Sequence, residues 1–351
     1  MYPKLIINKE KFESNLSIVS EAFKRSNISF TFVTKCFLAV SPLCDIAMPY
    51  VDYFGDSRIM NLEKLPASKK RVLLRMPMPS EASAAVRLAD ISLNSELETI
   101  KALNAAAKEQ GRIHGIVLMA DLGDLREGYY STEAMLKDAE LIKEMQHVKI
   151  MGIGVNLSCY GGVIPKIEHM ERLIIWAGEL EALLGYKLDM VSGGNSSSLK
   201  FVLEGIMPSG INNLRIGEGV LNGIDSTVGE PFKGMDTDVF MFEAEIIEIK
   251  EKPTAPEGER GFNAFGERVQ IKDQGIRKRA ILAAGRQDID PSGLIPVNPS
   301  YTVLGASSDH LLVDIHDGDE PLNIGDTIKF HCSYSAILRA CTSPYVTKEL
   351  T

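Results

Sequence analysis

A lysine within an apolar run is the first residue of this chain that suggests chemistry. Lys35 lies near the end of FTFVTKCFLAV (30–40), a β-branched and aromatic run that predicts a buried strand. Lysine side chains are almost never fully buried without a partner. One interpretation is that the amine reaches water from the end of the strand. The other is a desolvated amine that does covalent chemistry, such as Schiff-base formation.

Two glycine-containing segments follow the last two strand-like runs of the first 235 residues. SGGNSSS (192–198) combines small residues and hydroxyls before an expected helix, and RIGEG (215–219) follows the next run. Backbone N–H groups approach a phosphate closely in such loops, although an ordinary turn with an N-cap serine has the same composition. GEGVLNG is not a dinucleotide-binding fingerprint. The two segments together favour a phosphate site.

Two arginines also lie at expected strand ends. The two residues are Arg126 in DLGDLREG and Arg215 in RIGEG. One interpretation is that each faces a bound group, and the other is that each forms a salt bridge with a barrel carboxylate. Asp121 and Asp124 could do acid–base chemistry, but aspartates in such loops more often form turns. No His or Cys pattern has metal-ligand spacing, so we expect no metal site. A lysine, two phosphate-type loops and an arginine fit the cofactor pyridoxal phosphate.

Eight strand-like runs alternate with helical patterns and explain how these residues could meet. The runs lie at 30–38, 50–57, 71–77, 89–95, 114–123, 148–157, 188–196 and 213–219. Between them, segments such as 93–111 and 170–185 have apolar residues at helical spacing. Alternation of this kind predicts an α/β fold, a (β/α)8 TIM-type barrel over 1–235. Barrel active sites lie at the carboxyl ends of the strands, where the candidate residues fall.

The pattern changes after about Asp236. Strand-like segments at 240–253, 266–273, 275–285, 301–307, 310–316 and 326–333 are joined by turns, with no long helix between them. These segments predict an all-β C-terminal domain over 236–351. KLIIN (4–8) is also strand-like and could pair with that domain.

Composition places the chain among ordinary soluble proteins. It has 351 residues, a net charge of −9 and a pI of about 5.3, which argues against a nucleic-acid or anionic-membrane partner. The N-terminal segment lacks the apolar stretch of a signal peptide, and no run approaches the length of a membrane span. Five scattered cysteines without a C-x-x-C pair fit reduced thiols. We therefore expect a cytoplasmic protein.

Several long strings resemble the alanine-racemase-like enzymes that use pyridoxal phosphate. The strings are MYPKL, VDYFGDSRI, DLGDLREGYY, GIGVNLSCYGGVIPK, VSGGNSSS, NLRIGEG, GIRKRAIL and LGASSDHLLVDI. They cover nearly the whole chain and are most similar to the ornithine racemase branch. The resemblance implies a homodimer that acts on a small-molecule amino acid, with each C-terminal domain contributing to the partner's active site. It also implies interconversion of L- and D-ornithine by two-base transfer of the α-proton.

The resemblance assigns roles to individual residues. Lys35 would bind the cofactor covalently and take the α-proton, and Arg126 would help to position a second base. Ser308 and Asp309 would lie near the substrate carboxylate of the partner subunit. The residues that would bind the cofactor are Lys35, Asn156, Asn195, Ser196, Arg215, Gly217, Glu218 and Tyr345.

Three positions depart from the family pattern. Ala39 stands where the family has a tyrosine, and Met119 where it has a lysine. The family's second base is a tyrosine in G-Y-x-D-G-Y, whereas this chain has GRQDID (285–290) with Arg286 at that place. An arginine stays protonated and cannot be a general base.

The second base is therefore open. His310, Asp288 and Asp309 are the candidates, and His310 has the most suitable intrinsic pKa. A histidine at the start of a strand can equally face solvent.

Two alternative functions remain for the whole protein. One is a racemase for another amino acid, such as lysine or alanine. The other is a non-catalytic carrier of pyridoxal phosphate, which would resemble the barrel alone.

Overall fold

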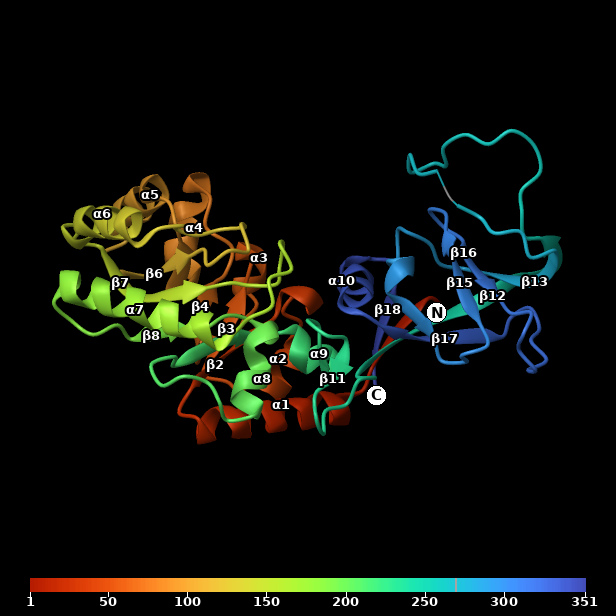
Figure 1. Cartoon of the computed structure of the whole chain (residues 1–351), viewed down its shortest axis with the longest axis horizontal. Coiled ribbons are helices and arrows are strands. Elements are labelled where there is room, and N and C mark those ends of the chain that lie inside the picture. The colour runs from red at the N-terminus through yellow and green to blue at the C-terminus, as the bar shows by residue number, and fades with distance from the viewer. Residues whose placement is uncertain (269) are drawn as a thin grey trace. The chain divides into compact units, whose positions relative to one another are not determined.

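The structure is a computed structural model that describes residues 1–268 and 270–351. The chain forms two compact units (Figure 1). One unit is Phe12–Thr237, and the other combines Met1–Lys11 with Asp238–Thr351.

The first unit is a closed barrel of eight parallel strands. Each strand pairs with the next along the chain, and β9 pairs with β2 to close the barrel. Every predicted run overlaps one of these strands, so the predicted fold class is confirmed. The strands are β2 (Ser29–Val33), β3 (Tyr53–Asp56), β4 (Lys70–Leu73), β5 (Ile91–Asn94), β6 (His114–Ala120), β7 (Val148–Val155), β8 (Met190–Ser192) and β9 (Asn213–Ile216).

One α-helix precedes β2, and the others follow barrel strands. The α-helices are α1 (Lys9–Arg25), α2 (Ser41–Ala47), α3 (Ile59–Leu62), α4 (Ala82–Leu88), α5 (Leu97–Glu109), α6 (Thr132–Lys143), α7 (Ile167–Leu184), α8 (Leu199–Leu203) and α9 (Glu218–Asn222). Short 3-10 turns are η1 (Lys35–Phe37), η2 (Pro79–Glu81) and η3 (Ser196–Ser198), and β10 (Ile224–Asp225) pairs with β11 (Glu230–Pro231).

Alternation along β2 decides which side chains face the helices. Phe30 and Phe32 point outward, and their rings lie 5.1 Å from Phe23 and 5.9 Å from Phe12 of α1. Thr31 points into the barrel, where its hydroxyl accepts a hydrogen bond from Asn213 at 3.0 Å. The apolar face of α1 is thus held against the outside of the barrel, and the inside is free for polar groups near β9.

Elsewhere the barrel interior is apolar. The buried side chains of this cluster come from strands β4, β5, β6 and β8, and Tyr53, Leu74 and Met151 pack against it. Its members are Val72, Ile91, Leu93, Val117, Met119 and Met190. The barrel is therefore a packed core that holds the strand ends in place.

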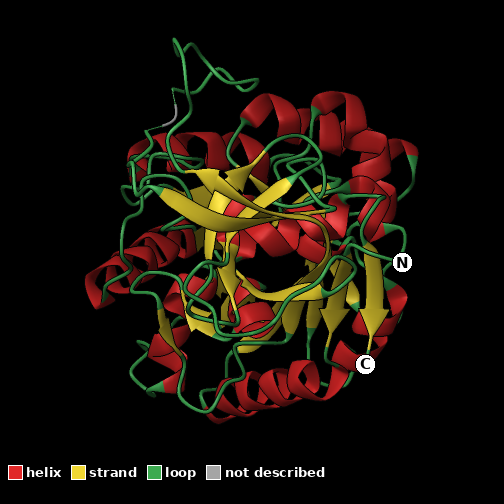
Figure 2. Ribbon diagram, turned by 90° about the vertical axis from the view of Figure 1, so that its right-hand side faces the viewer, coloured by secondary structure: helices red, strands yellow, loops and turns green. Residues whose placement is uncertain are grey.

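The second unit is built mainly of antiparallel strands. They run in the order β14-β17-β12-β13-β16-β15; β1 pairs with β12, and β18 pairs with β1 in parallel. Figure 2 shows β18 as the strand that ends at the C-terminus. The elements are β1 (Lys4–Ile7), β12 (Phe240–Pro253), β13 (Ile276–Leu282), η4 (Pro291–Gly293), β14 (Leu294–Pro296), β15 (Thr302–Ala306), β16 (Leu311–Asp314), β17 (Thr327–Cys332), α10 (Tyr334–Thr342) and β18 (Thr347–Leu350).

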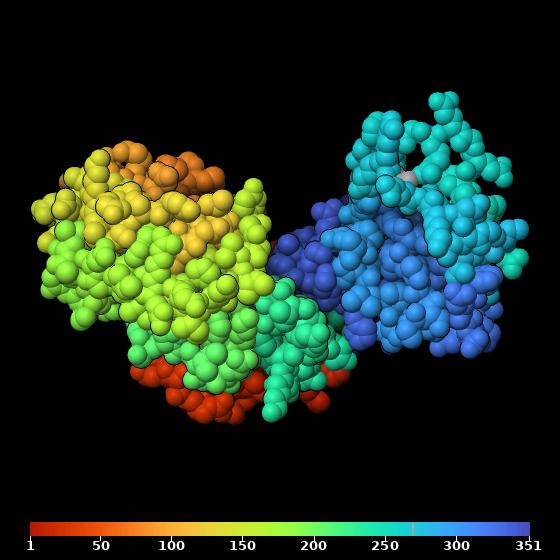
Figure 3. Space-filling view, viewed as in Figure 1, coloured from red at the N-terminus to blue at the C-terminus, as the bar shows by residue number. Residues whose placement is uncertain are grey.

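Two expectations for this unit need correction. The strand predicted at 266–273 is absent from the residues described there, 266–268 and 270–273, which belong to a long loop between β12 and β13 (Figure 3, cyan). Hydrogen bonds within the loop, such as that from the Glu267 N–H to the Asn263 side chain at 2.9 Å, take the place of pairing with a strand. The unit also contains a helix, α10, which the strand pattern did not predict.

Within the described residues, no helix combines the length and apolarity needed to cross a membrane.

Candidate active site

Lys35 lies just beyond β2 rather than within it, so its predicted place inside a strand is wrong. The chain turns into η1 at Lys35, and Leu38 and Ala39 take positive φ angles of 59° and 51°. Thr34 anchors the turn, because its hydroxyl donates to Asp56 at 2.7 Å and its N–H to the Gly55 carbonyl at 2.9 Å. The lysine side chain is half-buried at the carboxyl end of the barrel.

Arg215 is buried inside the barrel, with 5% of its surface exposed. Its Nη2 donates to the Val155 carbonyl at 2.6 Å, and Nη1 donates to the Ser192 hydroxyl. Burial lowers the pKa of Arg215 to about 10, so the group still carries its charge at neutral pH. No hydrogen bond of Nε is found among the described residues, which leaves this donor for a bound molecule.

A chain of polar side chains fixes the orientation of Arg215. Ser192, which accepts from Arg215, donates its hydroxyl to Asn213 at 2.6 Å. Asn213 in turn donates to Thr31 and to the hydroxyl of Ser29, both at 3.0 Å. Ser192 was not identified in the sequence as a partner of Arg215; its inward position on β8 is the signal that could have found it.

The loops after β8 and β9 meet in a cradle of backbone N–H groups. The Ser196 hydroxyl accepts from the N–H groups of Gly217 at 3.3 Å and Gly219 at 3.0 Å. A Cβ on Gly217 would lie 2.9 Å from the Cβ of Val33, and one on Gly219 would lie 2.9 Å from a methyl carbon of Leu199. Both positions need glycine, because any side chain would push these loops apart.

Asn156, Asn195 and Arg126 lie together beside this cradle. Asn195 donates to the side-chain oxygen of Asn156 and to the Leu157 carbonyl, both at 2.8 Å. With the amide of Asn156 turned over, its oxygen instead accepts from Nη1 of Arg126 at 3.1 Å. Arg126 also forms a two-point ion pair with Glu127, a partner that the sequence reasoning missed.

Asp124 has a structural role at this end of the barrel. Its carboxylate accepts N–H groups from the loop after β7, at 3.0 Å from Ser158 and 2.9 Å from Tyr160, with two more from Cys159 and Val163. Burial opposes the ionised form, but these backbone bonds lower the pKa of Asp124 below its ordinary value. Asp121 accepts N–H groups of its own loop at 2.9 and 3.1 Å. Both carboxylates are thus occupied in holding loops.

The remaining predicted residues belong to the second unit and form a group of their own. Gln287 donates to the carboxylate of Asp309 at 2.6 Å, and the Ser308 hydroxyl donates to the same carboxylate at 2.8 Å. The Arg286 N–H donates to the Ser307 carbonyl at 2.9 Å. The segments 285–288 and 307–310 are therefore joined at one end of the sheet.

Arg286 is held by the long loop between β12 and β13. Its Nη1 and Nη2 each lie 2.9 Å from an oxygen of Glu267, and its guanidinium lies 4.2 Å from the ring centre of Phe265. Its Nε donates to the Ala306 carbonyl at 3.1 Å. The ion pair with Glu267 raises the pKa of Arg286 further, so this residue holds its proton.

The three candidates for a second base differ in their surroundings. Asp288 is buried and accepts the Gly285 N–H at 3.0 Å and the Ser343 hydroxyl at 3.4 Å, so it caps a turn. The carboxylate of Asp309 is bound by Gln287 and Ser308. His310 is exposed, and its N–H donates to the Ser307 hydroxyl at 3.2 Å.

Tyr345 follows α10 and is 65% exposed. Its N–H donates to the Ser343 hydroxyl at 3.2 Å, which links it to the turn capped by Asp288. Its phenol is therefore available to a molecule that approaches this end of the second unit.

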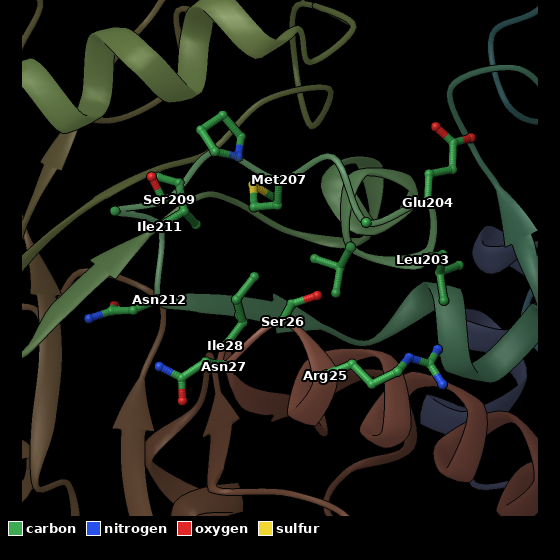
Figure 4. A pocket seen from close by; sticks show the side chains of 14 residues that line it. Arg25, Ser26, Asn27, Ile28, Leu203, Glu204, Met207, Ser209, Ile211 and Asn212 are labelled. Carbon is green, nitrogen blue, oxygen red and sulfur yellow. The ribbon is translucent and has the colours of Figure 1, made fainter.

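A hollow of the surface lies at the other end of the barrel (Figure 4). Its lining includes Arg25 at the end of α1 and Asn27 just after that helix. On the other side it includes Met207, Ser209 and Asn212, which lie between α8 and β9. Asn212 immediately precedes β9, so this hollow faces the amino ends of the strands. It is not the site formed by Lys35 and Arg215.

A family model agrees with the barrel. The family described as "Alanine racemase, N-terminal domain" matches residues 7–221. The solved structures that resemble this chain include an alanine racemase from Streptomyces lavendulae, with a TM-score of 0.75, 16% identity, and coverage of 100% of this chain and 98% of the other. Another is an alanine racemase from Bartonella henselae with covalently bound pyridoxal phosphate, with a TM-score of 0.72, 14% identity and full coverage of both chains. At these identities the likeness shows the fold.

Two relatives are much more similar in sequence. An ornithine racemase from Acetoanaerobium sticklandii is 46% identical over 352 residues and covers 100% of both chains. A lysine racemase from Thermotoga maritima is 40% identical and covers 99% of this chain and 98% of its own. With the family model matching more than half of the chain and relatives matching all of it, this protein belongs to the alanine racemase N-terminal domain family.

Proposed function

We propose that this protein is a pyridoxal-phosphate-dependent amino-acid racemase that interconverts L- and D-ornithine. The observation that carries the proposal is the 46% identity to an ornithine racemase over the full length of both chains. The geometry of the barrel is consistent with it, because the lysine, the buried arginine and the glycine cradle lie at the carboxyl ends of its strands.

The residues at this end of the barrel fit the cofactor by the chemistry of their donors. Lys35 offers a primary amine, and Arg215 a fixed guanidinium whose Nε has no partner among the described residues. Ser196 offers a hydroxyl for a phosphate, and Gly217 and Gly219 offer the backbone N–H groups that donate to this hydroxyl. When bound, pyridoxal phosphate withdraws electrons from the substrate's α-carbon and so acidifies its α-proton.

Each residue then has a defined task. Lys35 Nζ would hold the cofactor and would take the α-proton of the substrate from one face. Arg215 remains protonated, so it would donate a hydrogen bond to the cofactor without giving up the proton. Asn156 and Arg126 would help to hold the cofactor, and Asn195 and Ser196 would bind its phosphate.

The second proton donor is assigned to the second unit. We infer that His310 has this role, because Arg286 is fixed as a cation and Asp288 caps a buried turn. Ser308 and Asp309 would lie beside the substrate. This arrangement requires a homodimer in which each second unit completes the barrel site of the partner. We also propose that the protein works in the cytoplasm.

The alternative substrate is lysine, which the 40% identical relative favours. Chiral chromatography after incubation with the L-isomers of ornithine, lysine and alanine tests the assignment. We expect D-ornithine to form with the highest kcat/KM. Faster conversion of lysine would reassign the substrate, and conversion of none of the three would favour a carrier of the cofactor.

A further inference from the structure

Arg126 and Glu127 form an ion pair that joins two points of each side chain. Nε of Arg126 donates to Oε2 of Glu127, and Nη2 donates to Oε1. The side chain of Glu127 is 11% exposed, so this carboxylate is largely withdrawn from water. A two-point pair of this kind fixes the plane of the guanidinium as well as balancing its charge.

The loop after β6 holds the backbone of Glu127 in place. Gly128, the next residue, has a φ of 126°, and a Cβ there would lie 2.5 Å from the Asp121 nitrogen. The Tyr129 N–H then donates to the Met119 carbonyl at 2.8 Å, and the Asp121 N–H donates to the Tyr129 carbonyl at 2.9 Å. The chain beyond Glu127 thus returns to the end of β6, which fixes the point from which its side chain starts.

The other edge of the Arg126 guanidinium faces Asn156, which lies between two donors. The oxygen of Asn156 accepts from Asn195 at 2.8 Å or, with the amide turned over, from Nη1 of Arg126 at 3.1 Å. Asn195 is also the N-cap of η3, where it accepts the Ser197 N–H at 2.8 Å. Because the Asn156 oxygen faces one donor at a time, Arg126 needs an acceptor that does not depend on this amide. Glu127 supplies that acceptor at Nε and Nη2.

Two other acids at this end of the barrel are occupied by neutral donors. Asp124 accepts N–H groups of the loop after β7. Glu218, at the start of α9, accepts hydrogen bonds from the side chains of Asn222 and Ser226. Among the described residues, neither acid has a salt bridge within 4.0 Å, and the one salt bridge of Arg126 is with Glu127.

The charge of Glu127 acts on both arginines of the site. Burial opposes the charged form of Arg126, but the pair with Glu127 outweighs it and raises the pKa of Arg126. Burial lowers the pKa of Arg215, the charge of Glu127 opposes this shift, and the charge of Arg126 adds to it. One acid therefore helps to keep two neighbouring guanidinium groups charged.

We propose that Glu127 is a positioning residue for Arg126, fixing its guanidinium so that the Nη1 edge stays directed at Asn156 and at a molecule bound beside it. The inference rests on the proposed function, in which Arg126 helps to hold the cofactor. Without the carboxylate, the guanidinium keeps its charge but loses its fixed orientation. Binding of the cofactor should then weaken although every group that would touch it is still present.

The test is a double-mutant cycle of Glu127→Gln and Arg126→Met, with Glu140→Gln as a control. Glutamine keeps the length of the side chain and removes its charge, and Glu140 is an exposed acid of α6. Cofactor-free protein is titrated with pyridoxal phosphate, and the change in absorbance gives a dissociation constant for each variant. Thermal unfolding of the same cofactor-free samples measures their stability separately.

We expect each single variant to raise the dissociation constant about tenfold, since ionised hydrogen-bond partners at a fixed site couple this strongly. The double variant should bind within about twofold of Arg126→Met alone, because Glu127 has nothing left to position there. Glu140→Gln should match the wild type. If Glu127→Gln does not fold, Glu127→Asp, which keeps the charge but draws it back by one methylene, should weaken binding by less and only when Arg126 is present.

Three outcomes would overturn the inference. Wild-type affinity in Glu127→Gln would mean that the guanidinium needs no such partner. Losses that multiply in the double variant would mean that Glu127 acts independently of Arg126, as a support of its own loop. An equal effect of Glu140→Gln would indicate the general field of the protein. If the wild type itself binds no pyridoxal phosphate, the proposed function fails, and this inference fails with it.

Discussion

At the scale of single residues, Lys35 and Arg286 make the clearest contrast. Lys35 is half-buried at the strand ends with no ion pair among the described residues, whereas Arg286 is fixed by Glu267, Phe265 and the Ala306 carbonyl. An available amine can form a covalent bond, and a guanidinium held in this way can only position its neighbours. The two residues should therefore fail in different ways when they are replaced.

Replacing Lys35 with alanine should abolish both racemisation and covalent attachment of the cofactor, because no other amine is assigned to that position. Arg286→Ala should leave the attachment intact, since Arg286 belongs to the second unit and has no bond to Lys35. Borohydride reduction followed by mass spectrometry measures both variants. A Lys35→Ala protein that still forms the adduct at full yield would place the reactive lysine elsewhere.

His114 makes the stability of the barrel depend on pH. It is 2% exposed at the start of β6, and its Nε2 lies 2.8 Å from the Ser92 hydroxyl. Burial lowers the pKa of His114 to about 4. An unfolded histidine has a pKa of about 6.5, so between these values the unfolded chain binds the proton and the folded chain does not. Stability should fall as pH drops from about 6.5 to about 4, by about 3 kcal/mol in total from this residue.

Thermal unfolding at several pH values, compared between the wild type and His114→Gln, isolates this effect. The melting temperature of the variant should fall less steeply over that interval, because glutamine takes up no proton. Parallel curves for the two proteins would show that His114 does not titrate between these limits.

At the scale of elements, the contact between the loop after β9 and the end of β2 is the critical one. A methyl group on Gly217 would meet the Cβ of Val33 at 2.9 Å and its carbonyl oxygen at 3.1 Å. Gly217→Ala should separate the two loops and weaken binding of pyridoxal phosphate by about tenfold or more, a loss of about 1.4 kcal/mol. Fluorescence or absorbance titration with the cofactor measures the change.

Gly178 provides the matched control. It lies on an exposed face of α7, where an added Cβ would meet nothing within 4 Å. Gly178→Ala should leave cofactor affinity unchanged and stabilise the helix by about 0.5–1 kcal/mol. Equal losses of affinity in the two variants would remove the steric explanation.

The elements also show what the sequence can predict. The short apolar runs, the helical spacing between them and the glycine loops after the last two runs were sufficient to place the barrel and its functional end. The turn at Lys35 was not predictable, because it depends on positive φ angles at Leu38 and Ala39, which are not glycines. The segment 266–273 resembled a strand in sequence, yet its described residues pair with no strand. Alternating apolar and polar residues do not by themselves provide a neighbouring strand. The pairs of Arg215 with Ser192 and of Arg126 with Glu127 depend on three-dimensional contacts and were missed.

At the scale of the whole molecule, the proposed homodimer has two sites that each use residues of both chains. A Lys35→Ala chain would then lack a working barrel part. A chain with Ser308, Asp309 and His310 replaced by alanine would lack a working second-unit part. Because random exchange of subunits gives half mixed dimers with one intact site each, a mixture of the two inactive variants should regain about a quarter of wild-type activity.

Size-exclusion chromatography with light scattering establishes the dimer, and tagged copies of each variant confirm that subunits exchange. Mixed dimers without recovered activity would indicate that each site is built from a single chain. A monomer with full activity would contradict the shared site outright.

The most direct test of the proposed reaction is proton NMR in D₂O with pyridoxal phosphate and L-ornithine, combined with chiral analysis of the same sample. The proposal predicts that the α-proton signal disappears while D-ornithine accumulates to an equal mixture, because both faces of the α-carbon receive deuterium. Loss of the α-proton without D-ornithine would contradict the two-base mechanism, since only Lys35 would then be exchanging the proton. An α-proton signal that persists would contradict ornithine as the substrate.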